Sequence, residues 1–108
     1  VLRRTRFLLS QAEIEAESKR VTALERVARD YRERLLPRSE RNVTLLREGY
    51  AQGLAPISAL VQAQQQLSET SASYAETLGE LRRAEVELET AAAASPLLSD
   101  AGSQEPRR

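Results

Sequence analysis

The chain has 108 residues and contains no cysteine, histidine, methionine or tryptophan. Without cysteine it can form neither a disulfide nor a thiolate metal site. Without histidine it lacks the side chain that titrates near neutral pH and binds most zinc and copper ions. Aromatic residues make up only 4% of the chain. Any catalysis would therefore depend on carboxylate, hydroxyl, lysine or arginine side chains alone.

The carboxylates do not converge in the way that a catalytic or metal site requires. They include two alternating runs, Glu13, Glu15 and Glu17, and Glu85, Glu87 and Glu89. On a helix only residues three or four positions apart share a face, so neighbours within these runs point in different directions. We therefore expect no enzymatic activity, no bound metal and no cofactor.

Long apolar runs and an excess of one charge are also missing. The chain carries 16 basic and 16 acidic residues, and no apolar run approaches the roughly 18 residues that a membrane-spanning helix needs. We therefore expect no direct membrane insertion by this chain. Arginines recur between Arg26 and Arg41, as in nucleic-acid-binding helices, but acidic residues are interleaved with them. A solvated, ion-paired helix face is the preferred interpretation, so no nucleic-acid partner is expected.

Leucine and alanine, sixteen of each, dominate the apolar residues and recur with helical periodicity. Over residues 57–94, steps of three and four predict a helix-packing seam of the coiled-coil type. Gln64 within it fits either a register-setting hydrogen bond or a solvated lining, and we favour the former. The predicted seam comprises Ile57, Leu60, Gln64, Leu67, Ser71, Tyr74, Leu78, Leu81, Glu85, Leu88 and Ala92.

The first half of the chain shows a seven-residue spacing that changes phase near Pro37. The spacing runs through Phe7, Ile14, Val21, Ala28 and Leu35, and resumes one residue out of step at Leu36, Val43 and Tyr50. Proline lacks an amide donor and its ring crowds the carbonyl four residues earlier, so we predict a kink or break over residues 34–37.

These patterns predict an all-α fold, a long antiparallel helical hairpin of the coiled-coil type over residues 1–94. We expect a first helix over about 3–49, a turn over about 50–55 and a second helix over about 56–94. Gly53 suits the left-handed residue that ends a helix, and Pro56 suits the first position of the next. Residues 95–108 lack periodicity and contain several helix breakers, so we predict a disordered tail.

Opposite charges favour this antiparallel arrangement. Residues 1–47 hold 12 basic and 7 acidic side chains, whereas residues 48–108 hold 4 and 9. The two segments should attract each other when folded back, which helps orientation more than stability, because exposed ion pairs contribute only about 0–1 kcal/mol each.

The predicted turn carries the motif Tyr50-x-x-Gly53, and the run Leu-Val-Gln-Ala-Gln follows at residues 60–64. This order resembles the second-repeat hairpin of the TolC-like family of outer membrane efflux proteins. Members of that family show Tyr-x-x-Gly, six residues, and a Leu-Leu-Asp-Ala-Gln-like run. The preceding stretch, residues 35–42, looks like the Leu-Pro-x-Ala-Glu segment common in the heavy-metal and cation efflux branch. The resemblance covers about residues 30–90.

The resemblance implies the periplasmic helical part of an outer membrane channel in a tripartite efflux system, within a longer protein of the periplasm and outer membrane. It implies a homotrimer that docks with a periplasmic adaptor (membrane fusion) protein and reaches the inner-membrane pump indirectly. Docking and gating are assigned to the tip residues Tyr50, Gln52 and Gly53. The residues assigned to helix packing are Leu60, Gln64, Leu67, Tyr74, Leu78, Leu81 and Leu88.

The chain departs from the family pattern in three places. Gln62 stands where an aspartate is usual, Ser39 replaces an alanine, and no basic residue follows Gly53, which puts a charged latch at this tip in doubt. The barrel strands and first repeat of the family are missing, so we expect this chain to be one part of a larger protein.

Two other interpretations belong to different functional classes. The first is a soluble coiled-coil interaction or oligomerisation module unrelated to transport. The second is a helical protein that associates with nucleic acid. Strands anywhere between residues 57 and 90 would exclude the hairpin on which the transport interpretation depends.

Overall fold

The computed structural model describes residues 2–94, and the side chains of residues 11–93. It contains helix α1 (Leu2–Asp30), a π-helical turn η1 (Tyr31–Leu35), helix α2 (Leu36–Ala51) and helix α3 (Ile57–Ala94). No strand occurs within residues 2–94, so the predicted all-helical class is confirmed for this range. The predicted tail over 95–108 and the side chain of Phe7 lie outside the described residues.

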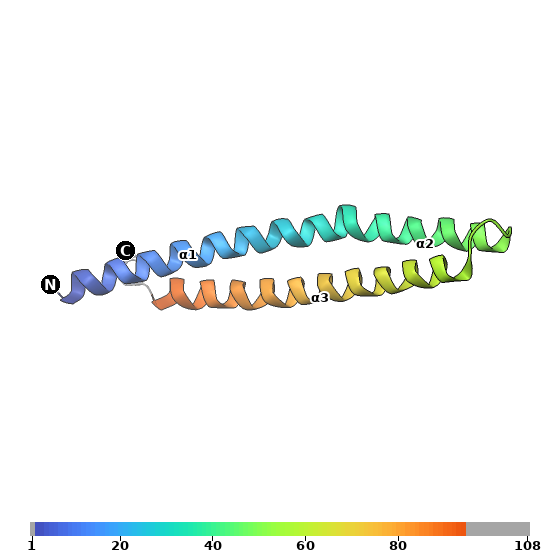
Figure 1. Cartoon of the computed structure of the whole chain (residues 1–108). Helices are drawn as coiled ribbons and strands as arrows, with labels where there is room; N and C mark the ends of the chain where they lie inside the picture. The colour runs from blue at the N-terminus through green and yellow to red at the C-terminus, as the bar shows by residue number, and fades with distance from the viewer. Residues whose placement is uncertain (1, 95–108) are drawn as a thin grey trace, which may run out of the picture. The chain divides into compact units, whose positions relative to one another are not determined.

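The chain divides into two compact units. The hairpin unit is the continuous segment Glu25–Gly79, and the terminal unit combines the chain up to Leu24 with the chain from Glu80 onward. In the hairpin unit, α2 and the first part of α3 lie side by side and antiparallel, joined by a tight turn (Figure 1). The predicted helical hairpin is therefore present in this unit. No helix within residues 2–94 has both the length and the hydropathy needed to cross a bilayer.

The core of the hairpin unit is a thin layer between α2 and α3. Its buried residues are Val43 (5% exposed), Leu60 (7%) and Ala63 (4%), and Leu46 and Leu67 pack against them. A layer this thin buries few large side chains, and burial of apolar area is the dominant favourable term in folding. Each large residue in the layer therefore carries a substantial part of the stability of this unit.

The buried stripe of α3 differs in part from the predicted seam. Leu60 is buried, and Leu67 and Tyr74 are half-buried, whereas Gln64 and Leu78 lie on the exposed side. The intervening positions of the stripe are occupied instead by Ala63, Thr70 and Thr77. The physical reason is that small residues on α3 let the facing helix approach closely on that side, so their row, rather than the row of Gln64, completes the stripe.

The terminal unit has its own buried positions and an ion pair between its two helical segments. Val21 (9% exposed) and Ala84 (0%) are buried, and the predicted seam residues Leu81 and Leu88 are half-buried. The Arg20 guanidinium bonds to the Glu87 carboxylate at 3.1 Å, with both side chains about half exposed. This contact has the charge signs that the sequence predicts for the two segments.

The π turn explains the change of phase near Pro37. The backbone N–H of Leu36 donates to the carbonyl of Tyr31, five residues earlier, in place of the usual four. The wider turn contains one extra residue. The apolar stripe can therefore pass from the row of Leu35 to the row of Leu36 and remain on the face that packs against α3. The sequence predicts a kink or a break over 34–37. The helical backbone continues through residues 31–37, so a break is absent, and a π turn of this kind is a known cause of helix kinks. Helix α2 begins with Pro37 in its first turn, where proline is tolerated.

Candidate interaction site at the hairpin tip

Backbone hydrogen bonds close the turn at the tip in a fixed geometry. The Gly53 N–H donates to the Tyr50 carbonyl at 3.0 Å, and the Leu54 N–H donates to the Gly49 carbonyl at 2.7 Å. This pair of bonds is the Schellman motif that ends many helices. Gly53 has a φ of 75°, a left-handed conformation that glycine adopts without steric cost. The sequence-based assignment of Gly53 to this position agrees with the backbone.

Gly49 allows the chain to turn back closely. A Cβ atom at Gly49 would lie 3.2 Å from the Cβ of Ala55, which is tighter than ordinary van der Waals contact. The Ala55 N–H also donates to the Gly49 carbonyl at 3.1 Å. Two glycines with different roles therefore shape the tip, since Gly49 provides space and Gly53 provides the left-handed backbone.

The turn presents several apolar side chains to solvent. Leu54 is 80% exposed, Ile57 50% and Tyr50 48%, and Gln52 and Gly53 are also exposed. In a Schellman motif the residue after the glycine commonly packs on a side chain one turn back in the helix. Here that position is Gly49, so Leu54 has no side chain to cover there and projects outward.

Sequence reasoning identified Tyr50, Gln52 and Gly53 at the tip but overlooked the exposure of Leu54 and Ile57. A signal for Leu54 was available, because a leucine directly after a C-terminal glycine needs an apolar partner one turn earlier and the sequence offers only Gly49. Ile57 was assigned to the seam, one row away from the stripe that the structure buries.

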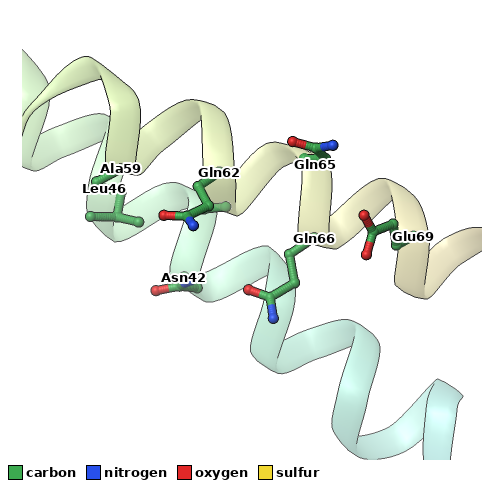
Figure 2. A pocket seen from close by; sticks show the side chains of 8 residues that line it. Asn42, Leu46, Ala59, Gln62, Gln65, Gln66 and Glu69 are labelled. Atoms are coloured by element: carbon green, nitrogen blue, oxygen red, sulfur yellow. The ribbon is translucent and has the colours of Figure 1, made fainter.

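Beside the tip, α2 and α3 enclose an open groove lined by carboxamides. Its lining includes Asn42 and Leu46 of α2 and Gln62, Ala63, Gln66 and Glu69 of α3, and its volume is 460 Å³. Figure 2 shows the Gln62 and Gln66 side chains extending from α3 on the same side as Asn42. Carboxamides both donate and accept hydrogen bonds, so this surface suits recognition of polar groups.

The tip and groove contain no arrangement suited to metal binding. Among the residues that the structure describes, no three histidine, cysteine or acidic side chains gather closely enough to hold a metal ion. What the site offers is shape, exposed apolar surface and hydrogen-bonding groups, namely carboxamides and the Glu69 carboxylate, which are the means of protein recognition.

An aromatic pair lies farther from the tip, where the π turn begins. The rings of Tyr31 in η1 and Tyr74 in α3 have centroids 6.3 Å apart and are inclined at 43°. This spacing and tilt fall within the range favoured for aromatic pairs. The predicted seam residue Tyr74 therefore holds the start of the π turn against α3.

Comparisons with known proteins return no relatives for this chain. No protein-family model matches it, no curated protein matches it, and no solved structure matches it. The function of the chain is therefore inferred from the residues of the tip, the groove and the buried stripe.

Proposed function

We propose that this chain is the periplasmic helical hairpin of a TolC-like outer membrane channel, acting in a tripartite efflux system. The observation that carries the proposal is the tip, where the Tyr50-x-x-Gly53 motif coincides with the turn between two antiparallel helices. The turn exposes Tyr50, Leu54 and Ile57, so its apolar surface is available to a second protein. The Leu-Pro segment at residues 36–37 favours the cation-exporting branch.

Assembly of a trimer would use the face of α3 that the hairpin leaves open. Between residues 57 and 79 the only charged residues of α3 are Glu69 and Glu76. The exposed residues there are otherwise small or neutral, including Val61, Ala72 and Ala75. Small uncharged side chains allow a helix from a neighbouring protomer to approach closely, which supports side-by-side packing of several hairpins.

Docking of a periplasmic adaptor would use the tip. Exposed Tyr50 and Leu54 provide apolar anchors, and Gln52 provides a neutral donor and acceptor beside them. Aromatic and large aliphatic side chains that become buried at the centre of an interface carry most of its binding energy. In this proposal the adaptor links the channel to the inner-membrane pump, and no basic latch residue contributes to closure of the tip.

The proposal is tested in the full-length protein that contains this chain. We expect Tyr50→Ala combined with Leu54→Ser to abolish chemical cross-linking to the adaptor and to raise sensitivity to exported compounds, while the trimer remains. Val86→Ser is a matched control, because Val86 is 54% exposed and lies in the terminal unit. Unchanged adaptor cross-linking and resistance in the tip variant would overturn the proposal. Self-association without any adaptor contact would favour the coiled-coil module unrelated to transport.

A further inference from the structure

The apolar stripe of the hairpin unit passes through two adjacent leucines at the π turn. Leu35 continues the spacing that includes Ala28, and Leu36 begins the spacing that includes Val43. Both leucines are half-buried. The π turn supplies the single extra residue that separates the two phases. One residue corresponds to a rotation of about 100° at 3.6 residues per turn, so the turn decides which face α2 presents to α3.

A regular α-helix through the same residues would present a different face of α2. Counting seven from Leu35 without the extra residue reaches Asn42, and counting fourteen from Tyr31, whose ring packs on α3, reaches Leu45. Leu45 is 66% exposed in the structure, an unusual position for a leucine in a helix that packs on another. We call this arrangement, with a regular α-helix in place of the π turn, the second register. In it Leu45 and Asn42 would turn toward α3, and Val43 and Leu46 would turn away.

The structure leaves room for this rotation. A groove of 590 Å³ lies on the side of α2 that carries Asn42 and Leu45, and Gln66 and Thr70 of α3 also line it. Leu35 lines the same groove at the level of the π turn. A leucine that rotated from the surface would therefore enter existing space between the helices.

Two features hold the stretch before the π turn in place. Ala28 is 3% exposed, and the Tyr31 ring packs on Tyr74 with centroids 6.3 Å apart. The alternative in which this stretch rotates and α2 stays fixed would place charged residues, among them Arg29 and Arg32, on the buried face. Burial of unpaired charges is costly. Rotation of α2 would turn a single charged residue, Arg38, toward α3, at a position that already lines the open groove, so α2 is the part that turns.

Pro37 biases the equilibrium toward the observed register. In a regular helix its ring would crowd the carbonyl of Glu33, and the π turn relieves this contact. The observed register also buries Val43 and covers Leu46. The second register is therefore a minor state, which a ligand or partner that prefers it would populate.

We propose that the π turn Tyr31–Leu35 is a register switch, at which conversion to regular α-helix turns α2 on α3 and exchanges Val43 and Leu46 for Asn42 and Leu45. The switch also changes the tip, because Tyr50 follows Val43 by seven residues and Gly49 follows Asn42 by seven. This inference holds for the hairpin whether or not it belongs to an efflux channel.

Cysteine cross-linking of the complete chain distinguishes the two registers, and the chain has no native cysteine to interfere. Leu46→Cys with Ala63→Cys reports the observed register, because Leu46 packs against the cluster that contains Ala63. Leu45→Cys with Ala63→Cys reports the second register. We expect rapid disulfide formation in the first pair, and slower but complete formation in the second.

Changes at the switch should act on the second pair alone. Deletion of Glu33, made together with Pro37→Ala so that no proline ring crowds the resulting regular helix, removes the extra residue and should abolish cross-linking of the second pair while the first pair still forms. Pro37→Ala removes the steric bias and should speed cross-linking of the second pair roughly tenfold or more. Glu33→Ala keeps the chain length and is the matched control, expected to behave as the parent chain.

Three outcomes would overturn the proposal. The first is cross-linking of the second pair at the same rate with and without Glu33, which would indicate general opening of the hairpin. The second is no cross-linking of the second pair even with Pro37→Ala. The third is loss of cross-linking in the first pair on deletion of Glu33 while circular dichroism shows unchanged helix content. This outcome would mean that the π turn does not contain an extra residue relative to the observed register.

Discussion

The two units of this chain use helix α3 in different ways. In the hairpin unit α3 carries only Glu69 and Glu76 as charged residues over 57–79, whereas over residues 80–94 it carries four glutamates and two arginines. The hairpin unit buries Val43, Leu60 and Ala63 in one cluster. The terminal unit buries Val21 and Ala84 and adds the Arg20–Glu87 ion pair. One helix therefore combines a neutral surface suited to further helix contacts with a charged surface suited to water.

This difference shows where recognition and stability are concentrated. A neutral, small-residue helix surface costs little to desolvate when another helix covers it, whereas a charged surface must lose or pair its charges first. The exposed apolar residues of the tip, Leu54 and Ile57, lie in the same unit as the neutral surface. We therefore expect the hairpin unit to carry the contacts of this protein, and the following changes test that expectation.

The largest effect is expected from Leu60→Ala in the hairpin unit. Leu60 is 7% exposed and belongs to the only buried cluster that the described residues form. Its loss should lower the free energy of unfolding by about 2–4 kcal/mol through lost apolar burial and a residual cavity. Leu88→Ala, at a half-buried position of the terminal unit, should cost less, and urea unfolding followed by circular dichroism measures both. Equal losses would contradict the difference between the units.

Ala84→Leu tests how closely the helices approach in the terminal unit. Ala84 is 0% exposed, so the larger side chain has no space and should destabilise the chain by about 1–3 kcal/mol. Ala72→Leu is the matched control on the exposed side of α3 and should change the unfolding free energy little. If Ala84→Leu stabilised the chain, the close packing at Ala84 would be disproved.

Gly53→Ala tests the left-handed residue of the tip. Its φ of 75° strains any residue that has a Cβ atom, so we expect a loss of about 1–2 kcal/mol. Nothing lies within 4 Å of the position where that Cβ would be, so the cost should come from the backbone alone. Gly53→Asn should therefore recover part of the loss, because asparagine tolerates this conformation better. Thermal unfolding compares the two variants.

The smallest effect is expected from Glu87→Gln. The Arg20–Glu87 pair is half exposed, and such pairs contribute about 0.2–1 kcal/mol, less at high salt. The loss should therefore shrink as sodium chloride is raised, whereas the loss from Leu60→Ala should persist. A large, salt-independent loss at Glu87 would show that the terminal unit depends on its ion pair more than on its buried residues.

Much of the fold was predictable because helical periodicity is a local property of the sequence. The row that includes Leu60, Leu67 and Tyr74 was identified from its seven-residue spacing, and these residues lie in the buried stripe. The second row of the buried stripe was harder to predict, since two rows of residues on α3 flank the row of Leu60 at equal angles. One contains Ile57 and Leu78, which are larger, and the other contains Ala63 and Thr70. Residue size favoured the first row, but close helix approach requires the second.

The tip was predictable in part for a similar reason. Gly53 marked the end of a helix through its backbone preference, which needs no knowledge of the rest of the fold. The exposure of Leu54 depends on Gly49 standing one turn earlier and on Ala55 returning close to it. The π turn was visible only as a one-residue change of phase. Whether such a change becomes a break, a kink or a wider turn depends on how much apolar surface stays buried when the stripe remains packed against α3.

By itself, the sequence determined that this chain forms long helices, where they turn back, and that it lacks the residues for thiol or imidazole chemistry. These properties follow from backbone preferences and from which residue types are present. Only the tertiary structure decided which face of α3 is buried, that the helix continues through Pro37 by a π turn, and that Leu54 projects from the tip. Each of these depends on how closely two helices approach, and that distance is set by side chains far apart in the sequence.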